Sequence, residues 1–302
     1  MGSYRSLGVS FYNSSLQLAE VEHGKKQNIT ALGEFSTSLA FERIGSSLTP
    51  KSPETATLAD DLKSAIKEAK ADPEMISFAL PAPIVFATIL PMDAGLGKVD
   101  LQGYLQWELS QYFPDAGPKE FVVDSHALPT KTVGVKDSFA AGVHRGTAGF
   151  VQEVAADLGL TLHLVDIDQF AAEKTLATNY PQILEHDIVL FGLRGNAIDA
   201  SVIHEGQMTD YRAYHNSDAK EAIRKYLKYL HDRYASTPAG LLLHGIGVNQ
   251  ELVGTLRDET GIKQTVALNA LRQISATDKV AKAYGKDNAK FCAAIGLALR
   301  AK

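Results

Sequence analysis

Residues 7–22, LGVSFYNSSLQLAEVE, predict two strands joined by a polar turn at Tyr12-Asn13-Ser14-Ser15. A second turn, whose Gly24 is free to take positive φ, leads into a third strand over residues 28–39. An amphipathic helix over 57–70 follows, and the apolar strand ISFALP at 76–81 comes after it. The first third of the chain is therefore one strand-strand-strand-helix-strand unit.

The same order of elements returns in the second half. This second copy comprises strands over 187–193, 197–204 and 208–214, a helix over 217–234 and the strand GLLLH at 240–244. Its first two strands are joined by the turn Arg194-Gly195-Asn196. Recurrence of the whole order predicts a duplicated α/β unit, which would give two facing mixed sheets with a cleft between them. The alternative is two unrelated α/β segments.

Between the two copies, residues 92–166 predict a small α+β subdomain that begins with a helix over 99–112. Strands over 121–128 and 138–144, a helix over 147–158 and a strand over 160–165 complete it. The segment 167–179 predicts a helix that crosses to the second copy. We therefore expect a first domain at 1–91, an inserted subdomain at 92–166 and a second domain at 167–302.

Composition excludes several classes of protein. The 302 residues are 45% hydrophobic and 22% charged, as in globular proteins, and the net charge of -5 carries no basic stripe for nucleic acid. The single cysteine, Cys292, lies in the apolar run FCAAIGLALR and is expected to be buried. The most apolar stretch, 76–92, contains three prolines and is too short to span a bilayer. The N-terminus has no signal-peptide pattern, so we expect a cytoplasmic protein.

Several segments resemble the PilM family, which are actin-like proteins of type IV pilus assembly, related in fold to FtsA. The matching stretches include LGVSFYNSSLQLAEVE, ISFALPAPIVFATILPM, LQWELSQYFPDAGPKEFVVDSHAL, LLHGIGVNQEL and CAAIGLALR. They occur in the family's order across nearly the whole chain. The most distinctive is WELSQYFP, which resembles the family's W-E-x-x-Q-Y-x-P segment. The resemblance implies a duplicated actin-like (ribonuclease H-like) two-domain fold.

The resemblance also implies a nucleotide site, built from two hairpin turns and, as its third part, a pair of glycines. Ser10, Tyr12 and Gln17 stand where the first turn of such proteins has aspartate, glycine and lysine, whereas Ser14 and Ser15 remain beside Asn13. In the second turn, Gly192-Leu193-Arg194, followed by Gly195, stands where the family reads D-I-G. Gly245 and Gly247 survive at the adenosine position.

These departures weaken the implied site. A hydrogen bond to a charged group contributes about 1.5–3 kcal/mol, so losing two acidic contacts weakens metal–nucleotide binding on the order of 10²- to 10⁴-fold. Tyr12 would compete with phosphate for space, while Arg194 would partly compensate as an anion partner. We expect weak ATP binding at most, with Mg²⁺ only if ATP binds, and no hydrolysis.

Three other side chains have two interpretations each. Asp166 and Asp168 precede the crossing helix and would either replace the missing acids or cap that helix, and we expect capping. His244 would contact a ligand or be an internally hydrogen-bonded histidine, and we expect the second. The histidines and acids have no metal-ligand spacing, and the chain carries neither a G-x-S-x-G nor a Walker motif.

The favoured function is a scaffold, docked indirectly on the inner membrane through a partner. By resemblance, the partner is the short cytoplasmic peptide of a PilN-like single-pass membrane protein. Leu105, Trp107, Glu108 and Tyr112 are the candidate contacts, in a groove bordered by 99–112 and 121–128. An active ATPase or small-molecule kinase is the alternative. An FtsA-like filament protein is disfavoured, because the chain ends at LALRAK without an amphipathic membrane helix.

Overall fold

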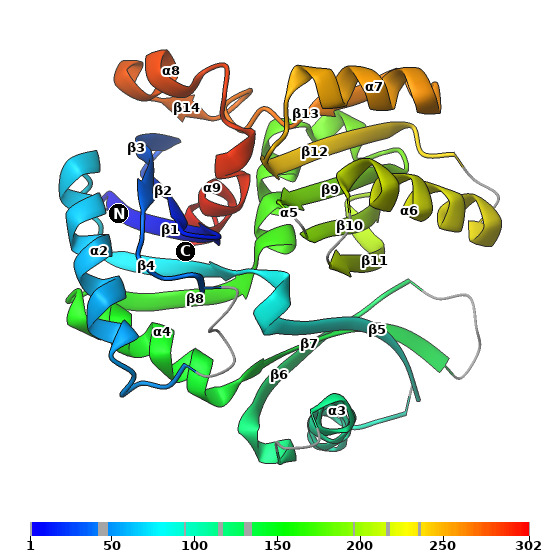
Figure 1. The fold of residues 1–302 in the computed structure, drawn as a ribbon, viewed down its shortest axis with the longest axis horizontal. Helices are drawn as coiled ribbons and strands as arrows, with labels where there is room; N and C mark the ends of the chain where they lie inside the picture. Colours follow the sequence, from blue (N-terminus) through cyan, green and yellow to red (C-terminus); the bar gives the residue numbers. More distant parts are fainter. Residues whose placement is uncertain are drawn as a thin grey trace.

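The computed structural model describes residues 2–41, 48–93, 95–113, 117–129, 135–195, 197–215, 218–234 and 237–301. Figure 1 shows two large sheets side by side, with helices packed around and between them and a smaller sheet below. No described helix is long and apolar enough to cross a membrane.

The first sheet has six strands in the order β14-β3-β2-β1-β4-β8. Its strands are β1 (Tyr4–Tyr12), β2 (Ser15–His23), β3 (Gln27–Ser36), β4 (Met75–Leu80), β8 (Thr161–Ile167) and β14 (Ser275–Ala276). β1 is buried from Ser6 to its end, as is expected of a central strand covered by helices on both sides. Helices α2 (Glu54–Ala69) and α4 (Arg145–Asp157) cover one face.

The second sheet repeats the first. Its order is β11-β10-β9-β12-β13, so its first four strands match β3-β2-β1-β4 of the first sheet in both order and direction. Its elements are β9 (Ile188–Arg194), β10 (Ala197–His204), β11 (Gln207–His215), α6 (Ala219–Tyr234), β12 (Gly240–Ile246), α7 (Gln250–Thr260) and β13 (Gln264–Ala267). The predicted duplication of a strand-strand-strand-helix-strand unit is confirmed.

The third sheet has the order β5-β7-β6, from β5 (Val85–Asp93), β6 (Phe121–Ala127) and β7 (Val135–His144). Helix α3 (Lys98–Tyr112) packs on one face of it, where Leu105 joins Leu90, Met92 and Ala140 in a small core. The strands group differently from the predicted boundaries. β5 begins before residue 92, while α4 and β8, predicted in the subdomain, belong to the first sheet's layer.

Two helices lie between the large sheets, as Figure 1 shows. These are α5 (Asp168–Asn179), the predicted crossing helix, and α9 (Cys292–Ala298), which returns from the end of the chain to pack on the first sheet. The Thr175 hydroxyl donates to the Cys292 carbonyl at 2.7 Å, and the Cys292 side chain is buried as predicted. Helix α8 (Asp278–Tyr284) completes the described helices.

Candidate functional site

The first hairpin turn joins β1 to β2, with Tyr12 paired to Ser15. Asn13 takes the left-handed conformation at φ 54°, which asparagine adopts more readily than most residues, and its side chain is exposed. The Ser15 hydroxyl donates to Glu34 on β3 at 2.9 Å. Of the predicted phosphate-binding residues in this turn, Asn13 and Ser14 are exposed, whereas Ser10 and Tyr12 are buried in the sheet.

The second turn, between β9 and β10, faces the first. Gly195 is left-handed at φ 67°, and a Cβ placed on it would lie 3.6 Å from Nδ2 of Asn13. The two turns therefore approach each other from the two halves, as the duplicated unit predicts. A side chain on Gly195 would therefore reach Asn13, so the two turns lie near each other.

Arg194 precedes Gly195 and is buried in an ion cluster of the second half. Its Nε lies 3.0 Å from a carboxylate oxygen of Asp168, and its Nη2 contacts Asp199. Tyr211 donates from its hydroxyl to the other oxygen of Asp199 at 2.9 Å. One cation thus faces two buried carboxylates, which occupy the position an incoming anion would need. The geometry contradicts the prediction that Arg194 is available to phosphate.

Asp168 does not cap α5, which corrects the sequence-based expectation. Ile167 is the residue before the helix, and no side chain caps its first turn. Asp166 accepts a hydrogen bond from the backbone N–H of Ile167 and pairs with Arg300 near the end of the chain. Asp168 therefore pairs with Arg194, whereas Asp166 binds both a backbone donor and Arg300.

A second buried polar group lies beside the cluster. Gln169 donates to the Leu190 carbonyl and to the Ser201 hydroxyl, each at 2.9 Å, and its Oε1 lies 3.0 Å from Nε2 of His244. The amide nitrogen of Gln169 donates to Leu190 and Ser201, so its oxygen is the atom that faces His244. An amide oxygen can only accept, and Nε2 of His244 is therefore the donor in this bond. Burial, together with the Arg194 charge, lowers the pKa of His244 to about 3. The expected internally bonded, neutral histidine is confirmed.

These side chains also explain Gly192, which stands where the family has its second acid. A Cβ at Gly192 would lie 2.7 Å from both Oε1 of Gln169 and Nε2 of His244, so the space is already filled. Nearby, burial raises the pKa of Glu173 to about 7. The hydrogen bond from Ser201 and the charge of Arg300 lower the same pKa, but their effect is smaller. The region is rich in buried polar groups, and some of them, such as Nδ1 of His244, have no hydrogen-bond partner among the described residues.

The glycine pair predicted at the adenosine position lies at the end of β12, with Gly245 inside the strand and Gly247 just after it. Gly245 has φ 98°, and a side chain there would overlap the carbonyl oxygen of Leu193 on β9, so this glycine serves strand packing. Gly247 has φ 89° and faces open space, and it begins the turn that leads to α7. Asn249 caps α7, because its side-chain oxygen accepts a hydrogen bond from the backbone N–H of Leu252 at 2.8 Å. Only Gly247 of this pair is open to a ligand.

The residues of the cleft do not fit a metal-bound triphosphate. The two turns lie near each other, the buried Arg194 is paired with two carboxylates, and a side chain at the position of the second acid would overlap Gln169 and His244. No group of three potential metal ligands gathers among the residues that the structure describes. Sequence reasoning missed Asp199 and Gln169. An aspartate at an inward position of the apolar strand AIDASVIH was the available signal, because such a carboxylate requires a cation.

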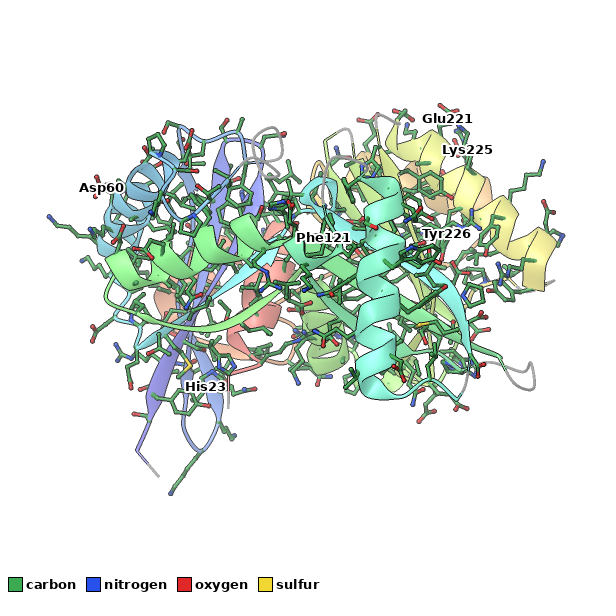
Figure 2. The ribbon with its side chains drawn as sticks, turned by 90° about the horizontal axis from the view of Figure 1, so that it is seen from below. His23, Asp60, Phe121, Glu221, Lys225 and Tyr226 are labelled. Carbon is green, nitrogen blue, oxygen red and sulfur yellow. The ribbon has the colours of Figure 1, made fainter. Side chains whose placement is uncertain are left out.

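The predicted partner surface lies on α3, which Figure 2 shows from below with Phe121 beside it. Leu105 is only 2% exposed, so it supports the helix and cannot contact a partner directly. Glu108 accepts a hydrogen bond from the Tyr104 hydroxyl at 2.8 Å. By contrast, Trp107 and Tyr112 are 51% and 58% exposed.

Two aromatic side chains that the sequence did not indicate extend this surface. Phe86 of β5 lies 4.7 Å from Tyr112 and 6.3 Å from Phe113, between ring centroids, and Phe113 is 42% exposed. We call the exposed Trp107, Tyr112 and Phe113 the α3 aromatic face. The half-buried Phe86 supports Tyr112 and Phe113 from β5. Exposed aromatic side chains of this density are typical of protein interfaces.

Comparison with known proteins supplies the fold. The sequence matches no family model and no curated protein. The structure is similar to a chain of a PilM–PilN type IV pilus biogenesis complex, with a TM-score of 0.80 and 18% identity, over 98% of both chains. A Bacteroides thetaiotaomicron protein with an actin-like ATPase fold and unknown function gives a TM-score of 0.50 and 14% identity, over 88% of this chain and 91% of that one. The chain therefore has the actin-like fold predicted from its sequence.

Proposed function

We propose that the chain is a PilM-like cytoplasmic scaffold of a type IV pilus or secretion-type assembly, held at the inner membrane by a PilN-like partner. The observation that carries this proposal is the likeness, over the full length of both chains, to a structure solved as a PilM–PilN complex. At 18% identity the likeness itself concerns the fold. The assembly and the partner are therefore what the experiments below test.

The α3 aromatic face is the proposed binding surface for the partner's cytoplasmic peptide. Its aromatic rings are partly exposed, so apolar side chains of an extended peptide can pack against them and bury apolar surface. Trp107 and Tyr112 are exposed, so removing them costs little folding free energy, which makes them suitable for mutation.

We expect the double variant Trp107→Ala and Tyr112→Ala to weaken binding of such a peptide at least tenfold, because interface aromatics commonly contribute 2 kcal/mol or more, on the order of 30-fold. Titration of a labelled N-terminal peptide of a PilN-like protein measures this. The matched control is Val99→Ala, which is 84% exposed on the same helix at the opposite end. Failure of the unmodified chain to bind the peptide, while a PilM protein binds it, would contradict the proposal.

We further propose that nucleotide binding is weak or lost. The support is the proximity of Asn13 to Gly195 and the buried pairing of Arg194 with two aspartates. We expect calorimetry with ATP, with and without Mg²⁺, to give flat heats up to millimolar nucleotide. The alternative function, an active ATPase or small-molecule kinase, requires saturable binding near micromolar Mg-ATP together with turnover. Both results together would establish that alternative.

A further inference from the structure

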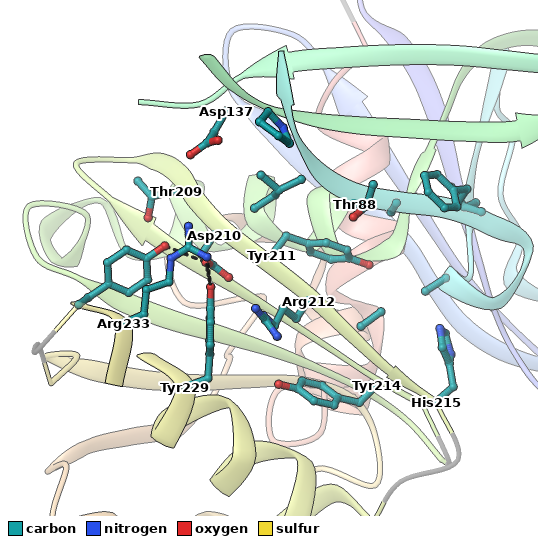
Figure 3. Close-up of a pocket in the computed structure, with 18 residues that line it drawn as sticks. Thr88, Asp137, Thr209, Asp210, Tyr211, Arg212, Tyr214, His215, Tyr229 and Arg233 are labelled. Atoms are coloured by element: carbon teal, nitrogen blue, oxygen red, sulfur yellow. Dashed lines mark hydrogen bonds between the residues drawn. The ribbon is translucent and has the colours of Figure 1, made fainter. Parts of the chain in front are cut away.

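A second surface lies on the opposite side of the small sheet from α3. Here a groove of about 770 Å³ runs between β5 of the small sheet and β11 of the second large sheet. Figure 3 shows β5, with Thr88, above the space, and β11, with Arg212 and Tyr214, below it. Its floor is apolar, because Tyr211 packs against Phe139 with ring centroids 5.3 Å apart.

Both walls of the groove are strand edges. β5 and β11 are the terminal strands of their sheets, so each has one side without a hydrogen-bonded neighbour strand. Consecutive residues of both strands, 85–89 and 209–215, line the groove. Side chains of a strand alternate between its two faces, so a run of consecutive lining residues means that the backbone edge itself faces the space. Such an edge is a template for another strand.

The two strands differ in the number of backbone N–H groups that their edges can donate. β5 contains Pro91, which has no backbone N–H, whereas β11 contains no proline and pairs regularly with β10 from Asp210 to His215. An added segment therefore finds more backbone donors on β11. Strand addition of this kind derives affinity from main-chain hydrogen bonds and specificity from side-chain positions.

The side chains on the β11 wall favour an anionic segment. Arg212 lies over the Tyr229 ring at 3.5 Å, and Arg233 donates to the Tyr229 hydroxyl at 2.9 Å. Within the described part of the chain, neither arginine forms an ion pair with a carboxylate. The nearest buried acid, Asp210, already accepts hydrogen bonds from the hydroxyls of three tyrosines, Tyr226, Tyr229 and Tyr234. Figure 3 shows Asp210, Tyr229 and Arg233 close together in the lining of the groove.

We propose that this groove binds an extended acidic peptide segment of a second partner protein, which adds to the free edge of β11 and places its carboxylates on Arg212 and Arg233. Stacking on Tyr229 pre-orients Arg212, so its guanidinium keeps its donors for the incoming carboxylate. The groove and the α3 aromatic face lie on opposite sides of the small sheet. The scaffold therefore has two separate docking surfaces, and this one does not depend on the PilN-like partner.

The test uses the full chain and a fluorescein-labelled seven-residue peptide of alternating glutamate and valine, followed by fluorescence anisotropy. We expect a dissociation constant below about 1 mM. Arg212→Ala and Arg233→Ala should each raise it roughly tenfold, because each removes a charge-assisted hydrogen bond. Both side chains are exposed, so the variants are expected to fold. The matched control is Arg224→Ala. Arg224 lies on α6, as Arg233 does, and its guanidinium is already bound to Glu259.

Two further peptides and one backbone measurement separate strand addition from simple charge attraction. A peptide with lysine in place of glutamate should not bind, and one with proline in place of alternate valines should lose most of its affinity. Peptide binding should also slow amide hydrogen exchange in residues 210–215. No binding, equal binding of the proline peptide, or an affinity unchanged by both arginine variants would overturn the proposal. The double variant Trp107→Ala and Tyr112→Ala should leave the affinity for the acidic peptide unchanged. A lowered affinity would also overturn the proposal, because it would place the peptide on the α3 aromatic face.

Discussion

Replacing Arg194 by leucine is expected to lower the free energy of unfolding by about 3–5 kcal/mol at neutral pH. The substitution removes the only cation in contact with Asp168 and Asp199 among the described residues, and both carboxylates are less than 2% exposed. Two buried like charges would then lie close together without the Arg194 cation between them. Urea denaturation followed by circular dichroism measures the loss.

Two matched variants make this result specific to burial. Arg224→Leu removes an arginine–carboxylate pair of good geometry on the surface, with 2.7 Å between Nη2 and Glu259, and should cost less than about 1 kcal/mol. Combining Arg194→Leu with Asp168→Asn and Asp199→Asn should recover most of the stability, because no uncompensated charge remains. A loss below about 1 kcal/mol for Arg194→Leu alone would mean that the cluster does not hold the second turn in place.

This cluster also marks the limit of what the sequence predicts. The helices and hairpins follow from local periodicity, and the repeated order gave the two sheets. The partners of Arg194 do not follow, because Asp199 comes from the opposing strand of the hairpin and Asp168 from the start of α5. Their proximity is set by strand register and by how the crossing helix docks, neither of which has a local sequence signature.

Strand β5 was missed for a different reason. The segment 81–91 has prolines at both ends, which predicts breaks rather than a ladder of hydrogen bonds. An edge strand tolerates Pro91 because one of its sides needs no donor. Missing β5 also hid Phe86 and the groove opposite β11, so the groove emerged only from the structure, whereas the α3 surface was predicted in part from the sequence.

The second large effect is expected at Gly296, in the helix α9 that lies between the two halves. A Cβ at this position would overlap the carbonyl oxygen of Ala171 on α5 and lie 3.0 Å from the Thr175 hydroxyl oxygen. Both obstacles belong to the crossing helix, and the carbonyl of Ala171 is backbone, so it cannot rotate away. Gly296→Ala should therefore lower the free energy of unfolding by about 3 kcal/mol, even though alanine favours helices.

The sign of the effect is the decisive observation, and Gly254 in helix α7 provides the control. A Cβ at Gly254 would meet nothing within 4 Å, so Gly254→Ala should raise the free energy of unfolding by up to about 1 kcal/mol, through helix propensity alone. Opposite signs from the same substitution would show that close packing of α9 on α5 holds the two halves together. Equal stabilisation by both variants would mean that α9 can move away from α5, and that the approach of Asn13 to Gly195 is not fixed by these helices.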